Sequence, residues 1–480
     1  MDNNLVLRTL GKMGYPVASY QDYLPKIEVF KSWYAGKVNS FHRYTYYNGI
    51  ESVSAVRKSM QMAKKVSEDW ANLILNEKVE INISDESLKK EIQDILKKNK
   101  FFSRANKLVE VAFALGTGAF VERAEVGEEK KIFIDYVRAD LIFPLVWDDD
   151  EITECAFASQ KIVDGKECIY LAIHYLMGNS YHVQNKLYRC NASYLKEIPL
   201  PDGVPEDWDT KSEQPLFQIV RPNIVNNLDL DAPFGISVFF NALDQIKGID
   251  LVYDSYMNEF VLGKKRLIVP VTLAQKMADA NGNRPVFDSN DIAFYALDVK
   301  DAQDKKDMLI DINPEIRAEA HSKALQDCLN LISDKVGFGT DRYKFDKGAV
   351  KTATEVISVK SDMYNNLIKH EQTVEEAIVS MVKAITFLLH GRLPDDSLEI
   401  SVNFDDSIIT DENTEIDNNI KLTNARLKPR IKAIMDLYEV DEKEAQKMLN
   451  QITDEDKVEG DSDADFFGTT KSKGKEEKDE

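Results

Sequence analysis

The sequence predicts an α+β protein in which an antiparallel β-rich region lies between helical segments. Three observations support this prediction. Helical periodicity covers 53–115 and returns at 237–262, 314–335 and 352–389, whereas 118–221 consists of short alternating or apolar runs between turn residues. The chain has 480 residues, enough for two to four domains, and 43% hydrophobic with 30% charged residues is typical of a folded protein.

The N-terminal part is predicted to be helical. Residues 25–50 are rich in aromatic side chains, which we expect to hold an early helix against a core. Residues 53–76 keep their apolar side chains on one helical stripe, and two further helices are expected at 85–99 and 101–115. Gly116 directly follows the last of them, at a position where glycine commonly ends a helix.

Residues 118–221 are predicted to form antiparallel strands flanked by helices. Strand-like runs, from AFVERAEV to LFQIV, are separated by turn residues. Asp164-Gly165 and Gly178-Asn179 stand between such runs and are typical of tight hairpin turns. The region is therefore predicted to be an antiparallel β-rich domain.

Two helices and a small insert follow. Apolar residues recur at three- and four-residue steps over 237–262, and Gly263 is expected to end this helix. A compact α/β insert is expected to have strands near 265–271, 292–299 and 307–312. Asn313 and Pro314 predict the start of a second helix over 314–335, because asparagine caps helices and proline suits their first turn.

A basic segment, DRYKFDKGAVKTATEV (341–356), separates this helix from the longest one. It stands out because the net charge of the chain is −21, and its basic residues are Arg342, Lys344, Lys347 and Lys351. Thr352 to Glu355 fits a capping box, which predicts a helix from there to Leu389. That helix would be about 55 Å long. Its polar middle, 360–373, would also allow a kink or two collinear helices.

The C-terminal part predicts a strand, short helices and a tail. LEISVNF (398–404) is strand-like, and short helices are expected over 411–452. Residues 453–480 hold eleven acidic and five basic side chains and almost no apolar ones. Such a segment cannot offset the entropy lost on ordering, so we expect a disordered acidic tail.

The sequence contains no strong catalytic motif. GxxxxGK[ST], HExxH and GxSxG are absent, and the four cysteines have no CxxC spacing. Asp148-Asp149-Asp150 could contribute carboxylates to a Mg²⁺ site, but we favour a charged turn between strands as their explanation. We expect no enzyme, no cofactor and no metal. Without a run of roughly 20 apolar residues or a signal peptide, we expect a cytosolic protein that does not contact membranes.

Six sequence blocks stand in a set order between about residues 25 and 452. They are KSWYAG (31–36), MAKKVSEDWANLILNEKV (62–79), FPLVWDDDEITECAFAS (143–159), FGISVFFNALDQIKGIDLVYDSYMNEFVLGKKRLIV (234–269), KTATEV (351–356) and NFDDSIITDENTE (403–415). In these blocks and their order, the chain resembles the portal proteins of long-tailed double-stranded DNA bacteriophages, the type found in phages of Gram-positive hosts.

The resemblance implies an elongated subunit of a ring, dodecameric in the virion, around a central DNA tunnel. Residues 1–235 would be a β-rich wing with N-terminal helices, 236–263 and 313–336 the two helices of a stem, and 264–312 a small α/β clip. Residues 337–351 would be the tunnel loop and 352–397 the long wing helix. Residues 398–452 would supply a β segment and crown helices, followed by the disordered tail 453–480.

The resemblance also implies a function and partners. A portal protein occupies one capsid vertex, is the conduit for genome packaging and ejection, and is not an enzyme. Its implied partners are further copies of itself, double-stranded DNA, the terminase large subunit, the head-completion (adaptor) protein, and capsid and scaffolding proteins. The chain would be assembled in the host cytoplasm and located in the virion.

The resemblance places the basic segment at the narrowest point of the tunnel. Arg342, Lys344, Lys347 and Lys351 would face DNA phosphates there, or else be solvated charges or pair with a neighbouring subunit. A second group, Lys264, Lys265 and Arg266, would either line the lower tunnel or bind the carbonyls at the end of a helix. Twelve copies would carry a charge of roughly −250, which would keep DNA from adhering to the tunnel wall.

Two other functions remain open from the sequence. One is a metal-dependent nuclease that uses Asp148–Asp150 together with Asp405-Asp406, which Mg²⁺- or Mn²⁺-dependent DNA cleavage would reveal. The other is a different structural virion component, such as a minor head or baseplate protein. Negative-stain images separate the second from a portal, which should appear as rings with a central hole.

Overall fold

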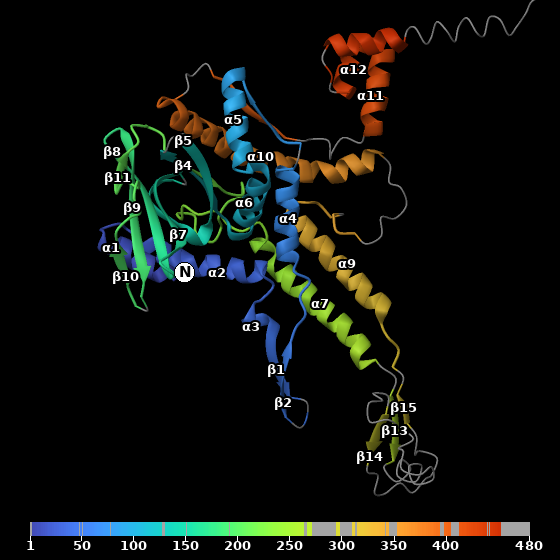
Figure 1. The fold of residues 1–480 in the computed structure, drawn as a ribbon. Coiled ribbons are helices and arrows are strands. Elements are labelled where there is room, and N and C mark those ends of the chain that lie inside the picture. Colours follow the sequence, from blue (N-terminus) through green and yellow to red (C-terminus); the bar gives the residue numbers. More distant parts are fainter. Residues whose placement is uncertain are drawn as a thin grey trace, which may run out of the picture. The chain divides into compact units, whose positions relative to one another are not determined.

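The computed structural model describes the greater part of the chain. The described residues are 2–47, 49, 51–76, 78–126, 130–149, 151–191, 193–263, 266–270, 294–297, 310–312, 314–340, 342–344, 353–393, 398–404, 412–438, 440 and 442–452. The chain divides into two compact units, Met1–Asp405 and Asp406–Glu480. Helices and mostly antiparallel strands both occur, as Figure 1 shows, so the predicted α+β class is confirmed.

The N-terminal segment forms three helices and a hairpin. Helices α1 (Asn3–Lys12), α2 (Ala18–Tyr34) and α3 (Asn39–His42) precede strands β1 (Arg43–Tyr47) and β2 (Ser52–Val56). Phe30 and Trp33 of α2 are buried, as expected for aromatic residues that hold a helix against a core. Tyr46 and Tyr47, in contrast, are exposed on β1.

The predicted helix over 53–76 begins later than expected. Ser52–Val56 alternates with the period of a strand and pairs with β1 in antiparallel register, so the prediction is wrong for these residues. Helix α4 (Met62–Ile74) begins only after Gln61, whose φ of 54° is left-handed and therefore not helical. Pairing with the adjacent strand decides the structure here, because the apolar stripe alone fits either element.

The next two helices match their predictions. They are α5 (Glu86–Lys98), which Asp85 caps by accepting hydrogen bonds from the N–H groups of Ser87 and Leu88, and α6 (Phe101–Leu115). Gly116 ends α6 with a φ of 89°. A Cβ at Gly116 would lie 2.2 Å from the carbonyl oxygen of Gly235, so only glycine fits this close approach.

The predicted β-rich region consists of two antiparallel sheets. Their strands are β4 (Gly118–Val126), β5 (Lys130–Arg138), β6 (Ile142–Asp148), β7 (Glu151–Val163), β8 (Lys166–Met177), β9 (Ser180–Cys190), β10 (Leu195–Ile198), β11 (Asp207–Asp209) and β12 (Phe217–Val220). One sheet has the order β10-β9-β8-β7-β6 with β11 on β9, and the other has the order β12-β4-β5. Both predicted hairpin turns are confirmed, and Asp164, Gly165 and Gly178 have positive φ.

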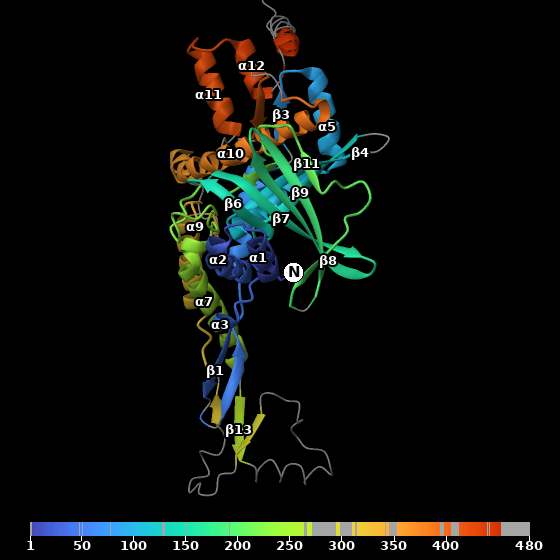
Figure 2. The same ribbon diagram turned by 90° about the vertical axis from the view of Figure 1, so that its left-hand side faces the viewer.

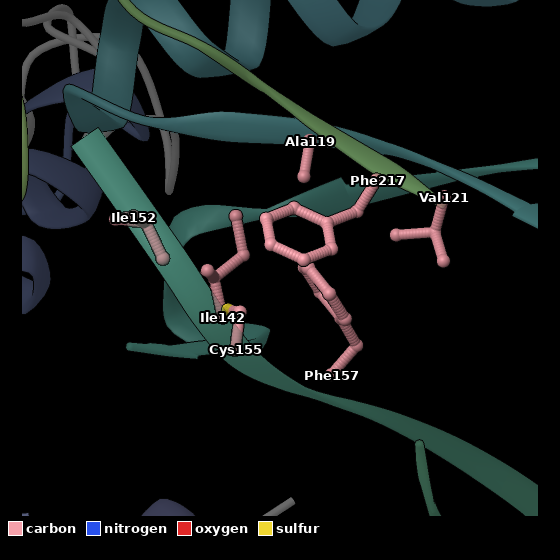
Figure 3. Packing of buried hydrophobic residues seen from close by; sticks show 7 residues of the cluster. All are labelled: Ala119, Val121, Ile142, Ile152, Cys155, Phe157 and Phe217. Carbon is pink, nitrogen blue, oxygen red and sulfur yellow. The ribbon is translucent and has the colours of Figure 1, made fainter. Parts of the chain in front are cut away.

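An apolar core joins the two sheets (Figure 3). Side chains from β4 and β12 meet side chains from β6 and β7, and the rings of Phe157 and Phe217 lie 5.3 Å apart. The members of this cluster are Ala119, Val121, Ile142, Ile152, Cys155, Phe157 and Phe217. Each large buried side chain contributes roughly 1.5–3 kcal/mol relative to exposure. The two sheets therefore pack against each other through this core.

The helix predicted at 237–262 is present but begins later. The N–H of Val238 donates to the carbonyl of Phe113, and a short 3₁₀ helix (Phe240–Ala242) precedes α7 (Leu243–Leu262). This tertiary bond ties the backbone at Val238 to α6 just before the helical segment begins. The helix ends at Gly263 as predicted.

The insert after α7 has strands where they are predicted. Strands β13 (Arg266–Pro270), β14 (Phe294–Leu297) and β15 (Ile310–Ile312) form a sheet of order β14-β13-β15, in which β13 and β14 run parallel. Helix α9 (Ala318–Lys335) then runs beside α7 (Figures 1 and 2). Its predicted start at Pro314 is wrong, because Arg317 turns instead to bind Glu259 of α7 through its N–H and guanidinium.

The longest helix is a single element. Helix α10 (Ala353–His390) has 38 residues and begins and ends within one residue of its prediction; Thr352 of the proposed capping box lies outside the described residues. The strand predicted at 398–404 is β16 (Ile400–Asn403), which pairs with β3 (Glu80–Ile83). None of the described helices combines the length and apolar character needed to cross a bilayer.

The second unit, described by itself, is helical. It contains α11 (Glu412–Asn424), α12 (Arg430–Tyr438) and a further helix over 442–452, in which Ala445 is buried. The prediction of short helices over 411–452 is confirmed for these ranges. The acidic tail 453–480 lies outside the described residues.

Candidate functional site

The structure describes the start of the predicted basic segment. Arg342 and Lys344 are both exposed, and Arg266 begins strand β13 opposite Ile312. Lys264, Lys265, Lys347 and Lys351, which complete the predicted set of tunnel residues, lie outside the described residues. We call residues 336–340 and 342–344 the loop root, because they lead from the end of α9 into the basic segment.

Aromatic stacking holds the loop root against α4. The indole Nε1 of Trp70 donates to the carbonyl oxygen of Val336 at 3.3 Å. The ring of Phe338 stacks on Trp70 at a centroid distance of 4.3 Å and an angle of 21°. Trp70 is completely buried and Phe338 nearly so. The chain therefore leaves α9 in a direction that α4 determines.

Two glycines allow the turn that this contact requires. Gly337 has a φ of 89° and Gly339 a φ of 73°, both in the left-handed region that favours glycine. The side-chain amide of Asn366 in α10 donates to the carbonyl of Gly337 at 3.1 Å, and the hydroxyl of Ser333 donates to the carbonyl of Gly339. Gly337 and Gly339 thus shape the anchored end of the basic segment.

A buried histidine joins the loop root to the rest of the first unit. The ring of His370 in α10 lies edge-on to Trp70 at 4.8 Å and to Phe113 of α6 at 5.0 Å. Its Nδ1 accepts a hydrogen bond from the N–H of Asn223 at 3.0 Å. Burial lowers the pKa of His370 to about 4, so the ring is neutral at physiological pH.

Arg342 is turned toward its own subunit. Its guanidinium lies 3.9 Å from Oδ1 of Asp69 and 5.5 Å from the ring centroid of Phe338. The nearly buried Asp69 also accepts a hydrogen bond from Lys65. Burial and the Asp69 carboxylate raise the pKa of the neighbouring Tyr343 hydroxyl. Arg342 thus contributes to anchoring, whereas Lys344 stands at the end of the anchored part.

A second anchor joins α7 to the two segments that flank the β1–β2 hairpin. The carboxylate of Asp250 accepts from the N–H of Met60 at 2.7 Å and lies 3.0 Å from Nε2 of His42. Nδ1 of His42 accepts a hydrogen bond from the N–H of Val38. Asp254 accepts from the N–H of Lys58 at 3.1 Å. These buried carboxylates therefore serve as structural acceptors along one face of α7.

The carboxylates considered for metal binding form a turn in the part that is described. Asp148 ends β6 opposite Glu151 of β7, and Asp149 has a φ of 50° between them. Asp150, Asp405 and Asp406 lie outside the described residues. Across the described ranges, no group of three or more His, Cys, Asp or Glu side chains could hold a metal ion.

The cysteines are free thiols with different exposure. Cys155 and Cys168 are buried, as expected for small hydrophobic residues, whereas Cys190 and Cys328 are only half-buried. Burial raises the pKa of the Cys155 thiol well above its ordinary value. A buried thiol of this kind is unreactive, in agreement with a packing role.

Sequence reasoning missed the residues that anchor the loop root. Asp69, Trp70 and His370 lie on α4 and α10, far along the chain from Phe338. The one available signal was the occurrence of a tryptophan and a histidine on otherwise ordinary helical stripes. Nothing in their spacing points to a loop more than two hundred residues away from Trp70.

A known protein family covers most of the chain. A family model described as phage portal protein, SPP1 Gp6-like, matches residues 17–458. No curated protein sequence matches the chain. The matched range includes the sheets, α7, α9, the loop root and α10, and thus all elements described for the first unit except α1. The chain therefore belongs to the phage portal protein family of the SPP1 Gp6-like type.

Proposed function

We propose that twelve copies of this chain form the portal ring at one capsid vertex of a long-tailed phage, through which DNA enters during packaging and leaves during ejection. The family match over residues 17–458 is the observation that supports this proposal. The portal family is a structural, non-enzymatic family of the phage virion, and it implies a homo-oligomeric ring associated with the capsid. The number of twelve subunits and the passage of DNA in both directions go beyond what the family match gives and are part of what we propose.

We assign the parts of the ring by the family's architecture. The N-terminal helices and the two sheets form the wing, α7 and α9 the stem, and residues 264–312 the clip. Residues 337–351 form the tunnel loop, α10 the long wing helix, and 398–452 the β segment and crown. In this proposal the clip binds the terminase large subunit during packaging and the head-completion protein afterwards, while capsid and scaffolding proteins contact the outer surface.

The tunnel loop would act through a few weak contacts with DNA. Every lysine that neutralises a phosphate adds affinity, and affinity opposes sliding. The loop root is held by Trp70, Phe338 and Asn366, so Lys344, Lys347 and Lys351 would extend from an anchored base toward the duplex. The net charge of −21 per subunit would keep the DNA away from the remaining wall.

Neutralising the loop lysines tests this mechanism. The triple variant Lys344→Ala, Lys347→Ala, Lys351→Ala should assemble into rings of normal subunit number, as native mass spectrometry would report. DNA retention in a packaging assay should fall several-fold, with a weaker dependence on salt. Lys323→Ala, an exposed lysine of α9, is the control. Normal packaging by the triple variant would contradict the role of the loop.

Electron microscopy tests the ring itself. Negative-stain images of the purified protein should show rings with a central hole. Their absence would favour a minor head or baseplate component instead. Incubation of the same sample with DNA and Mg²⁺ or Mn²⁺ should leave the DNA intact, and metal-dependent cleavage would reinstate the nuclease alternative.

A further inference from the structure

A groove of about 590 Å³ lies between β3 on one side and α5 with the first turn of α6 on the other. Figure 2 shows β3 beside α5. The floor of the groove is apolar. Val79, Ile81, Leu96 and Phe101 are buried there, and Phe102 forms a wall with 40% of its surface exposed. The groove is thus suited to a bulky apolar side chain.

The rim of this groove is basic, although the chain as a whole is acidic. Lys89, Lys97 and Lys100 line it, against the single carboxylate of Glu80. Lys89 donates to Oδ1 of Asn82 across the groove at 3.3 Å, while Lys97 and Lys100 are exposed. An occupant with negative charges beside its apolar side chains would match this lining.

The backbone conformation of Lys100 is unusual for a lysine. Its φ of 53° is left-handed, at the residue between the end of α5 and the start of α6. Glycine or asparagine would occupy this position with less strain, since a left-handed residue with a bulky side chain costs roughly 1–2 kcal/mol. The lysine side chain places a cation just past the end of α5, where it suits the helix dipole, and on the rim of the groove.

Strand β3 also presents an open edge. Its pairing with β16 uses one edge, because the N–H of Ser84 donates to the carbonyl of Glu399 and Asn82 lies opposite Ser401. Alternation along a strand then directs the N–H and C=O of Ile81 to the opposite edge. Among the described strands, none pairs with that edge.

We propose that this groove binds an extended acidic segment of a separate protein, which adds a strand to the open edge of β3. In this arrangement alternate side chains of the segment, large and apolar, enter the groove above Phe101 and Phe102. Its carboxylates lie at Lys97 and Lys100. Strand addition to an exposed edge is a common mode of peptide recognition, in which backbone bonds give affinity and pockets give specificity.

Duplex DNA is a less suitable occupant. Phosphates would meet the lysines, but a duplex offers neither an apolar side chain for the floor nor a peptide edge for β3. The peptide accounts for the basic rim, the apolar floor and the open edge together. This inference concerns a protein partner and does not depend on the proposed DNA tunnel.

Fluorescence anisotropy with the full-length protein tests the proposal. The probe is a fluorescein-labelled octapeptide, DFDIDFDG, in which acidic and apolar residues alternate. Lys97→Glu should weaken its binding by about fivefold or more, as expected for one surface charge contact turned repulsive. Lys98→Glu is the matched control, because the neighbouring Lys98 is exposed on the same helix but does not line the groove. The Lys98→Glu variant should bind the labelled peptide with the same affinity as the unmodified chain.

Lys100→Gly separates binding from folding. Glycine suits the left-handed backbone, so this variant should be at least as stable as the unmodified protein but bind the probe more weakly. Hydrogen exchange should show protection of the Ile81 amide when the probe binds. Equal binding by Lys97→Glu and Lys98→Glu, or binding without protection of Ile81, would overturn the proposal.

Two further outcomes would identify a different occupant. If a 20-base-pair DNA duplex binds in a Lys97-dependent manner and the probe does not, the groove is a nucleic-acid surface. If Lys97→Glu instead changes the subunit number in native mass spectrometry, the groove is an interface between copies of this chain. Either result would overturn the assignment to an acidic partner segment.

Discussion

The two-sheet region and the loop root are both well packed, but they are built in opposite ways. In the sheets, most strands pair with the next strand through a short hairpin, the exceptions being β12 on β4 and β11 on β9, and one apolar core joins the two sheets. In the loop root, Trp70 binds Val336, which is 266 positions away, and His370 of a third segment completes the contact. Local pairing makes the sheets predictable, whereas the loop root exists only after distant helices have assembled.

The two regions also bury titratable groups of opposite kind. Glu122 of β4 is 1% exposed, and burial raises its pKa to about 8. His370 is 4% exposed, and burial lowers its pKa to about 4. Both groups are neutral at pH 7 in the folded chain. High pH should therefore weaken the sheets, and low pH should weaken the loop root, where His370 is the buried histidine.

Removal of Trp70 should have the largest effect. Trp70→Ala deletes a completely buried ring together with its stack on Phe338 and its hydrogen bond to Val336. We expect a loss of about 3–5 kcal/mol in the free energy of unfolding, measured by chemical denaturation. Limited proteolysis should cut first near 336–344. The half-buried Trp208 of β11 provides a control variant, Trp208→Ala, which should cost less and leave the loop root protected.

Glu122→Gln should make the sheets more stable at high pH. The folded-state pKa lies above the ordinary value of 4.5, so the stability contributed by this group is complete below pH 4.5 and is lost as the pH rises through about 8. At pH 9 the variant should exceed the unmodified protein by on the order of 3 kcal/mol. The difference should vanish near pH 5. Glu125→Gln, an exposed change on the same strand, should show no such pH dependence.

Acid should weaken the loop root through His370. Its folded-state pKa lies below the ordinary value of 6.5, so its contribution is complete above pH 6.5 and is lost as the pH falls through about 4. We expect a loss of about 2–3 kcal/mol over this range. His370→Gln retains an acceptor for the N–H of Asn223. In this variant the free energy of unfolding should depend less on pH between 6.5 and 4. An unchanged profile would show that another group, such as the buried His174, dominates acid unfolding.

Arg342 and Lys344 should show the smallest effects on stability and the clearest separation of roles. Arg342→Ala removes a partly exposed contact with Asp69 and Phe338 and should cost at most about 1 kcal/mol. Lys344→Ala, at an exposed side chain, should cost no more than a surface contact does but should reduce DNA retention. If Arg342→Ala reduced DNA retention and Lys344→Ala lowered the free energy of unfolding, the roles that we assign to these two residues would be wrong.

Local sequence signals determined most of the secondary structure. The end of α6 at Gly116, the hairpins at Asp164-Gly165 and Gly178-Asn179, and the extent of α10 follow from turn residues and periodicity that act within a few positions. The basic character of 341–351 is likewise visible in the sequence alone. Such features depend on neighbouring residues, so the printed sequence contains the information that they require.

Tertiary structure decided the elements whose partners are far away. Strand β2 replaces the start of the helix predicted over 53–76 by pairing with β1, α9 begins late because Glu259 binds Arg317, and β3 pairs with the distant β16. The loop root depends on Trp70 and His370 from other helices, which is why Arg342 proves to face its own subunit. Periodicity shows which side chains need burial, but only the assembled fold determines which distant groups cover them.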